Sequence, residues 1–84
     1  MRHVTERGLD RIESLLAKLR DVDALTEKKR GVFYRRSKAF LHFHEDGDDI
    51  YADVRLEGSS FDRHRVSTVR EQEDLVRRIG RALA

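Results

Sequence analysis

The hydrophobic residues of the chain change their spacing at Gly31. Before that glycine, five large apolar residues recur at intervals of three and four, at Leu9, Ile12, Leu15, Leu16 and Leu19. This spacing places them on one face of a helix, and charged residues fill the other face. The pattern therefore predicts an amphipathic helix over residues 5–20.

After Gly31 the apolar residues alternate with polar ones, which is the period of a β-strand. The alternation predicts strands over residues 32–35, 39–44 and 50–56, and a poorer edge strand over 61–66. A tight turn at Arg36-Ser37 joins the first two strands. Asp46-Gly47 lies between the second and third, where an Asp-Gly pair is a strong hairpin signal.

The last segment has the signature of a second helix. Thr68-Val69-Arg70-Glu71 matches the capping box, in which the threonine and glutamate side chains satisfy each other's free backbone N–H groups. The residues that follow form an apolar face. The chain therefore predicts the order α-β-β-β-β-α: one α+β domain over residues 1–84, with two layers, in which both helices cover one face of a four-stranded antiparallel sheet.

Hairpin pairing divides the strand residues between two faces of this sheet. The face expected to meet the helices carries Val32, Tyr34, Ala39, Leu41, Phe43, Ile50, Ala52, Val54 and Leu56. The opposite face carries Phe33, Phe40, His42, His44, Tyr51, Asp53 and Arg55. No third helix is available to cover this second face, and three aromatic rings left in water favour a partner.

We consider three uses of the uncovered face. The first, and the one we favour, is association with a second copy of the chain. The second is a small ligand seated on the rings, with the histidines and the aspartate as polar contacts. The third is a metal site, because His42-x-His44 places two imidazoles on the same side of a strand and Asp53 or His64 could add a ligand. The alternative is that nearby arginine side chains cover the rings and nothing binds.

Composition limits these possibilities. The chain has 84 residues, of which 38% are hydrophobic and 40% charged, with a formal net charge of +2. It contains no cysteine, which removes disulfides, thiolate metal ligands and cysteine nucleophiles. No apolar run is long enough for a membrane helix, and the first residues do not resemble a secretory signal. We therefore expect a cytoplasmic protein that does not enter membranes.

The basic residues gather near the first two strands, at Lys28, Lys29, Arg30, Arg35, Arg36 and Lys38. Such a patch can contact phosphate, but we favour a solvated surface over nucleic-acid binding. The phosphate-binding glycine motifs and the serine and zinc hydrolase motifs are not found. We therefore predict no catalytic residue and no cofactor. The favoured function is a small non-enzymatic domain, and the alternative is a ligand- or metal-binding domain that could use the His-x-His/Asp cluster in catalysis.

Three stretches of the chain resemble one family. They are residues 40–47 with their His-x-His-x-Asp-Gly hairpin, residues 52–56 with Asp53, and residues 66–74, where a strand leads into an acidic helix start. Together they resemble the small uncharacterised domains labelled "luciferase domain", which are unrelated to the bacterial luciferase barrel. The resemblance implies a binding or accessory domain built on the hairpin, with His42, His44 and Asp53 as shared polar positions, and it does not imply light emission.

Overall fold

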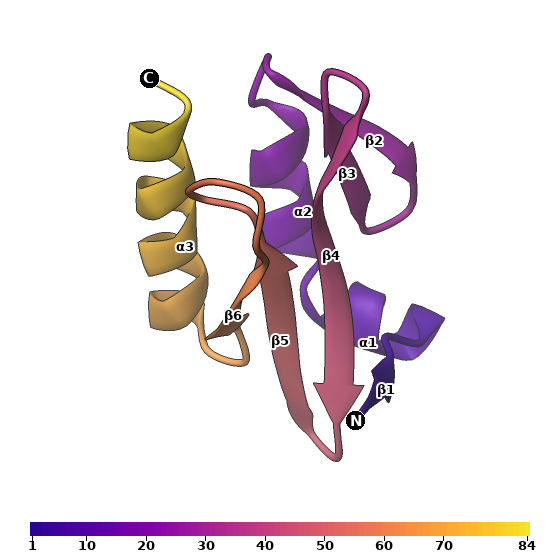
Figure 1. Cartoon of the computed structure of the whole chain (residues 1–84). Helices are drawn as coiled ribbons and strands as arrows, with labels where there is room; N and C mark the ends of the chain where they lie inside the picture. Colours follow the sequence, from indigo (N-terminus) through magenta and orange to yellow (C-terminus); the bar gives the residue numbers. More distant parts are fainter.

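The computed structural model describes all of residues 1–84. Its elements, in chain order, are β1 (Arg2–His3), α1 (Glu6–Arg11), α2 (Glu13–Arg20), β2 (Leu25–Lys29), β3 (Val32–Arg35), β4 (Lys38–Asp46), β5 (Asp49–Val54), β6 (Asp62–Arg65) and α3 (Val69–Ala82). The strands form one antiparallel sheet in the order β2-β3-β4-β5-β6, with β1 paired to β4 as well (Figure 1). The predicted two-layer α+β class is confirmed. The sheet is wider than expected, because β1 and β2 add to the four predicted strands.

The two predicted helices form as their patterns require. The N-terminal segment bends at Ile12, whose φ of −113° and ψ of 22° divide it into α1 and α2. Its apolar stripe is nevertheless buried throughout, from Leu9 to Leu19. At α3 the predicted capping box is present, since the Thr68 side chain accepts from the backbone N–H of Glu71 and the Glu71 side chain accepts from the backbone N–H of Thr68. No helix in the structure is both long enough and apolar enough to cross a membrane.

The β4–β5 hairpin is the longest strand pair of the sheet. Asp46 pairs with Asp49, so the connecting turn is Gly47-Asp48, one residue later than expected. Gly47 has a φ of 61°, which suits glycine at the first position of a type II′ hairpin turn. The resulting register pairs Leu41 with Val54 and His42 with Asp53. Relative to the expected pairing the register is shifted by two residues, which leaves the paired residues 41–46 and 49–54 on their predicted faces.

A β-bulge at Phe40 overturns part of the predicted division between the two faces. Phe33 pairs with Leu41 while Tyr34 pairs with Ala39, so Phe40 is an extra residue of β4 with no partner on β3. Phe33 and Phe40 are therefore core residues, with exposed fractions of 0% and 3%. Their assignment to the uncovered face was wrong.

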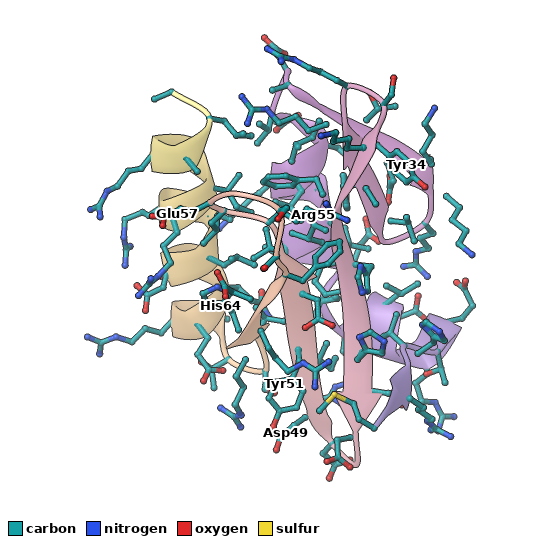
Figure 2. The ribbon with its side chains drawn as sticks, viewed as in Figure 1. Tyr34, Asp49, Tyr51, Arg55, Glu57 and His64 are labelled. Atoms are coloured by element: carbon teal, nitrogen blue, oxygen red, sulfur yellow. The ribbon has the colours of Figure 1, made fainter.

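The same bulge moves other residues out of the predicted core. Val32, Tyr34 and Ala39 are only half-buried and do not belong to the core cluster. The core contains sixteen residues: Leu9, Ile12, Leu15, Leu16, Leu19, Leu25, Phe33, Phe40, Leu41, Phe43, Ile50, Ala52, Val54, Val66, Leu75 and Ile79. It fills the space between the sheet and the helices as one continuous cluster. Tyr51 and Arg55 remain half-buried on the other side of β5, away from α2 (Figure 2).

A buried carboxylate fastens the N-terminus to the end of β4. Glu45 is 7% exposed and accepts hydrogen bonds from the backbone N–H and the hydroxyl of Thr5 and from Arg2, at 2.7, 2.9 and 3.0 Å. These charge-assisted bonds hold the pKa of Glu45 below its usual value. Gly8 allows the close approach, because a Cβ there would lie 2.6 Å from the Glu45 carboxylate. The anchor brings β1, and with it His3, alongside His44.

The two sheet faces can be distinguished by truncating one ring on each. Phe40→Ala removes a buried ring and should lower the free energy of unfolding by about 3–5 kcal/mol. Tyr51→Ala removes a ring from the uncovered face and should cost no more than about 1 kcal/mol. Urea denaturation followed by circular dichroism measures both. Equal losses for the two variants would contradict the assignment of the faces.

Candidate functional site

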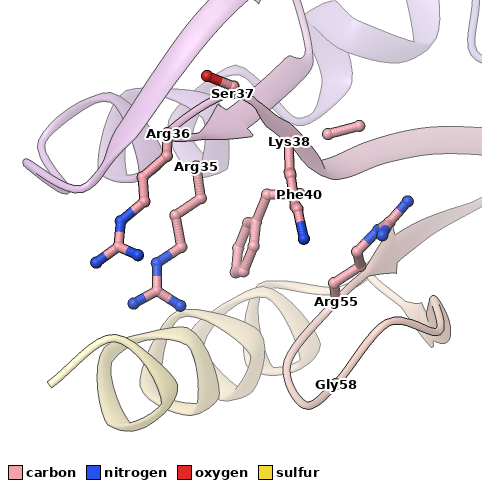
Figure 3. Close-up of a pocket in the computed structure, with 8 residues that line it drawn as sticks. Arg35, Arg36, Ser37, Lys38, Phe40, Arg55 and Gly58 are labelled. Carbon is pink, nitrogen blue, oxygen red and sulfur yellow. The ribbon is translucent and has the colours of Figure 1, made fainter.

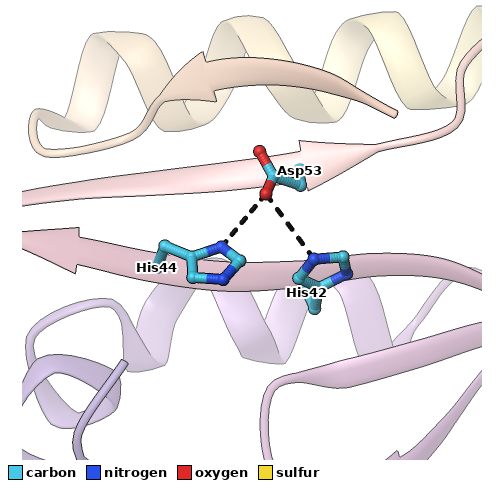
Figure 4. Close-up of side chains that lie close together, drawn as sticks. All are labelled: His42, His44 and Asp53. Carbon is cyan, nitrogen blue, oxygen red and sulfur yellow. Dashed lines mark ion pairs between the residues drawn. The ribbon is translucent and has the colours of Figure 1, made fainter. Parts of the chain in front are cut away.

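Two strands bring His42, His44 and Asp53 together on the uncovered face. His42 and His44 project from the same side of β4, two residues apart, and Asp53 lies directly opposite His42 on β5. The Oδ2 atom of Asp53 is 3.0 Å from Nδ1 of His44 and 3.5 Å from Nε2 of His42 (Figure 4). One carboxylate oxygen therefore faces a nitrogen atom of each imidazole.

Asp53 is a nearly buried carboxylate that a third strand neutralises. It is 7% exposed, and Arg63, its partner on β6, donates Nε to Oδ1 at 2.8 Å and Nη2 to Oδ2 at 3.0 Å. This two-pronged hydrogen bond holds the pKa of Asp53 below its usual value, against the opposing effect of burial. Asp53 therefore stays ionised at neutral pH, as a negative charge beside two imidazoles.

Both imidazoles have a nitrogen atom suited to a further contact. Burial lowers the pKa of His42, outweighing the attraction of Asp53, so its ring is neutral at pH 7. A neutral imidazole keeps a lone pair on one nitrogen, which is the form that binds metals. His44 Nδ1 is buried and makes no hydrogen bond, and it lies 3.0 Å from Oδ2 of Asp53.

Two further rings enclose the cluster. His3 stacks on His44 with 4.9 Å between ring centroids, and Phe61 meets His42 edge-on at the same separation. The two central imidazoles are themselves in edge contact at 5.2 Å. These contacts limit the movement of His42 and His44, and thus the positions that their nitrogen atoms can occupy.

A groove of about 630 Å³ adjoins the cluster. It lies along the edge of β4, which pairs with β3 up to Leu41 and with β1 from His44 onward. Just over half of its lining is apolar, namely Val4, Leu9, Val32, Tyr34, Ala39, Leu41 and Phe43, and Glu6, Lys29 and Arg30 add charged side chains. His3 and His42 line it too, which connects the groove to the histidine cluster. The volume lies within the range of small-molecule sites in proteins.

The uncovered face therefore holds only some of the expected residues. His42, His44, Asp53, Tyr51 and Arg55 lie there, whereas Phe33 and Phe40 are in the core. His64, considered as a ligand, pairs with core residue Ala52 and lies beside α3 (Figure 2). Strand alternation thus directs it away from the cluster.

Three contributors to the cluster were missed by the sequence reasoning. Arg63 lies in the segment predicted as a poorer edge strand, and no local pattern fixes the register of that strand, β6, against β5. Phe61 precedes Arg63 by two residues, and this spacing was the one available signal that the two side chains share a face. His3 lies at the N-terminus, outside every predicted element, and the anchor at Glu45 that holds β1 against β4 could not be read from the sequence.

The arrangement offers two chemistries. The nitrogen and oxygen atoms of His42, His44 and Asp53 that could bind a metal lie within 4.8 Å of one another. Two imidazole nitrogens and a carboxylate oxygen are a donor set found in zinc sites, where tetrahedral ligands lie about 3.4 Å apart, so small side-chain rotations would complete the geometry. An ionised aspartate beside a histidine can also assist proton transfer.

The chain was compared with protein-family models, curated proteins and solved structures, and none of them matches it. The geometry of the cluster is therefore the basis for assigning a function. The likeness to the luciferase-domain family stays a prediction, carried by the hairpin that holds His42 and His44 and by Asp53 opposite it.

The lowered pKa of His42 predicts how stability depends on pH in the presence of EDTA. As the pH falls, the His42 ring takes up a proton in the unfolded chain before it does so in the folded protein. The contribution of His42 to the free energy of unfolding is therefore complete above about pH 6.5 and is lost as the pH falls through the folded-state pKa. The free energy of unfolding should therefore decrease between about pH 7.5 and about pH 5.5, a range that spans histidine titration. His42→Gln should flatten this decrease in urea denaturation curves. An unchanged slope in the variant would contradict the prediction.

Proposed function

We propose that the domain binds a divalent transition metal through His42, His44 and Asp53. The observation that carries the proposal is the convergence of two imidazoles and one nearly buried carboxylate on neighbouring strands, with their donor atoms within 4.8 Å of one another. All three residues project from the β4–β5 hairpin, which is hydrogen-bonded along its length. Ligands on a hydrogen-bonded hairpin are held close to their final positions before the metal arrives.

The donor set favours one class of metal. Calcium and magnesium prefer six or more oxygen ligands, whereas imidazole nitrogen suits zinc, copper, nickel and iron. His42 is neutral at pH 7, so metal binding need not first remove a proton from its ring. Asp53 supplies a negative charge that partly compensates the charge of the cation.

Arg63 orients the carboxylate from outside the cluster. It contacts both oxygens of Asp53, and each oxygen retains a further lone pair for a metal. Hydrogen-bonded neighbours of this kind orient ligating carboxylates in known metal sites. Three protein ligands also leave at least one coordination position for water or a small molecule. The adjoining groove supports a role in binding a small ligand beside the metal.

Titration with Zn²⁺, followed by calorimetry and by NMR of the histidine rings, tests the proposal. The wild-type protein should bind one Zn²⁺, with movement of the His42 and His44 resonances. His44→Gln and Asp53→Asn should each weaken the affinity by more than about tenfold, because ligand loss costs at least as much as loss of an outer partner. His64→Gln removes an imidazole on the other side of the sheet and serves as the matched control.

Two results would contradict the metal site. One is the absence of any movement at His42 and His44 when Zn²⁺ is added. The other is an equal loss of affinity in His64→Gln and His44→Gln, which would indicate non-specific binding to histidines. Circular dichroism of each variant separates loss of binding from loss of the fold, and His42→Gln offers a second ligand variant that leaves the ion pair between Asp53 and Arg63 in place.

Self-association through the same face is the second candidate. No helix covers this face, and Tyr51 and Phe61 remain partly exposed on it. The exposed aromatic area is smaller than the sequence predicted, since Phe33 and Phe40 lie in the core. A metal held by three protein ligands could also accept a donor from a second copy, which would couple the two functions.

Sedimentation velocity at micromolar concentration, with and without Zn²⁺, measures self-association. We expect a dimer that Tyr51→Lys disrupts, because a charge would be placed within the apolar part of the contact. If the histidines lie at the contact, acidification from about pH 7.5 to about pH 5.5 should weaken the dimer, because charging them introduces repulsion. A monomer under all these conditions would reject self-association and would leave the metal proposal standing.

A further inference from the structure

A second cavity lies at the end of the sheet, between the β3–β4 turn and the loop that follows β5 (Figure 3). It has a volume of about 350 Å³ and is lined by four basic side chains, those of Arg35, Arg36, Lys38 and Arg55, with no acidic residue among its walls. We call it the basic cleft. Arg36 lies in the turn, Arg35 and Lys38 flank it at the ends of β3 and β4, and Arg55 follows β5 directly.

The four cations of the basic cleft have no carboxylate partner, a property that they share with exposed arginines such as Arg7 and Arg78 but not with the paired arginines of the chain. Arg20, Arg30 and Arg65 each pair with two or more carboxylates. By contrast, none of the four cleft cations makes an ion pair in the structure. Four like charges around one cavity raise the local positive potential, and an anion seated there would lower the electrostatic energy.

Arg55 supplies a buried donor without an acceptor. Its Nε atom is buried and has no hydrogen-bond partner. Its guanidinium lies over the Phe61 ring, 4.3 Å from the centroid, which restricts the orientation of the side chain. A buried donor left unpaired costs free energy, and a rotation of this side chain toward the cleft would let Nε donate to an oxygen atom of an anionic ligand.

The backbone that carries Arg36 is itself unusual. Arg36 has a φ of 59° and is the only residue other than glycine with a positive φ. It occupies the first position of the two-residue β3–β4 turn, where glycine or asparagine would adopt this conformation more easily. The strain is confined to a residue that lines the basic cleft, as expected where a local backbone geometry serves binding.

We propose that the basic cleft binds a small phosphate-bearing organic molecule. Guanidinium groups match the oxygen atoms of phosphate with two parallel hydrogen bonds, and Arg35 and Arg36 present their side chains on the same side of the cleft (Figure 3). Ala39 and the edge of Phe40 form the apolar part of the lining, which suits the organic portion of such a molecule. The volume fits a compact ligand near the lower limit for small-molecule sites.

The structure favours a small molecule over a nucleic acid. Proteins that hold single strands stack bases on exposed aromatic rings. Phe33 and Phe40 are 0% and 3% exposed and cannot act as such platforms, and the half-buried Phe61 ring is already covered by the Arg55 guanidinium. The basic cleft is also separate from the metal cluster in composition, since it shares no residue with His42, His44 and Asp53.

Binding of inorganic pyrophosphate, measured by calorimetry and NMR at low ionic strength in EDTA, tests the proposal. Wild-type protein should bind one pyrophosphate, with amide shifts confined to residues 35–38 and 55–58. Arg36→Gln and Arg55→Gln should each weaken the affinity about tenfold, the effect of losing one charge-assisted hydrogen bond. Arg70→Gln removes an exposed, unpaired arginine in the first turn of α3, which does not line the basic cleft. This change should alter the affinity less than about twofold.

Three outcomes would overturn the proposal. The first is the absence of binding at millimolar pyrophosphate. The second is an equal loss of affinity in Arg70→Gln and Arg36→Gln, which would indicate attraction by net charge alone. The third is tighter binding of a single-stranded oligonucleotide, with a steep salt dependence and shifts spread over the sheet, which would indicate a nucleic-acid surface. Because EDTA is present throughout, the affinity for pyrophosphate does not depend on whether His42, His44 and Asp53 bind a metal. Arg36→Gly provides a variant without backbone strain if Arg55→Gln fails to fold.

Discussion

The bulge at Phe40 is the constraint on which the arrangement of both sheet faces depends. An uninterrupted β4 would place Phe40 on the same face as His42, with its ring in water beside the histidines. The extra residue places both Phe40 and Leu41 in the core. Phe33 is buried there as well, because it pairs with Leu41. The hydrophobic effect favours this arrangement strongly, since two aromatic rings leave water. The polar residues that follow in β4 then occupy a face with few exposed rings.

On that face, charge and burial act against each other at Asp53. Burial disfavours an ionised carboxylate, but the two hydrogen bonds from Arg63 outweigh it and keep the group charged. The same burial keeps the neighbouring His42 neutral. One environment thus supplies a charged oxygen and a neutral nitrogen at neutral pH, which is the combination that a transition metal requires.

The proposed metal site and the basic cleft adjoin through one ring. Phe61 lies against His42 on one side and under the Arg55 guanidinium on the other. The loop between β5 and β6, which carries Phe61, therefore contributes to both places. In the basic cleft the unpaired cations gather because the β3–β4 turn and its flanking residues are rich in basic side chains and no acidic residue lines the cavity. A ligand in contact with Arg55 would be separated from His42 by the Arg55 and Phe61 side chains.

Local periodicity alone determined much of this molecule. It gave the α+β class, the buried helix stripe from Leu9 to Leu19, the capping box at Thr68 and the common face of His42 and His44, because each depends on neighbours a few residues away. Only the tertiary structure decided the bulge at Phe40, the strand β2 and the pairing of Arg63 with Asp53. Register between distant strands and the insertion of an extra residue are set by how the whole core packs, and a two-residue period contains no information about where it will be interrupted.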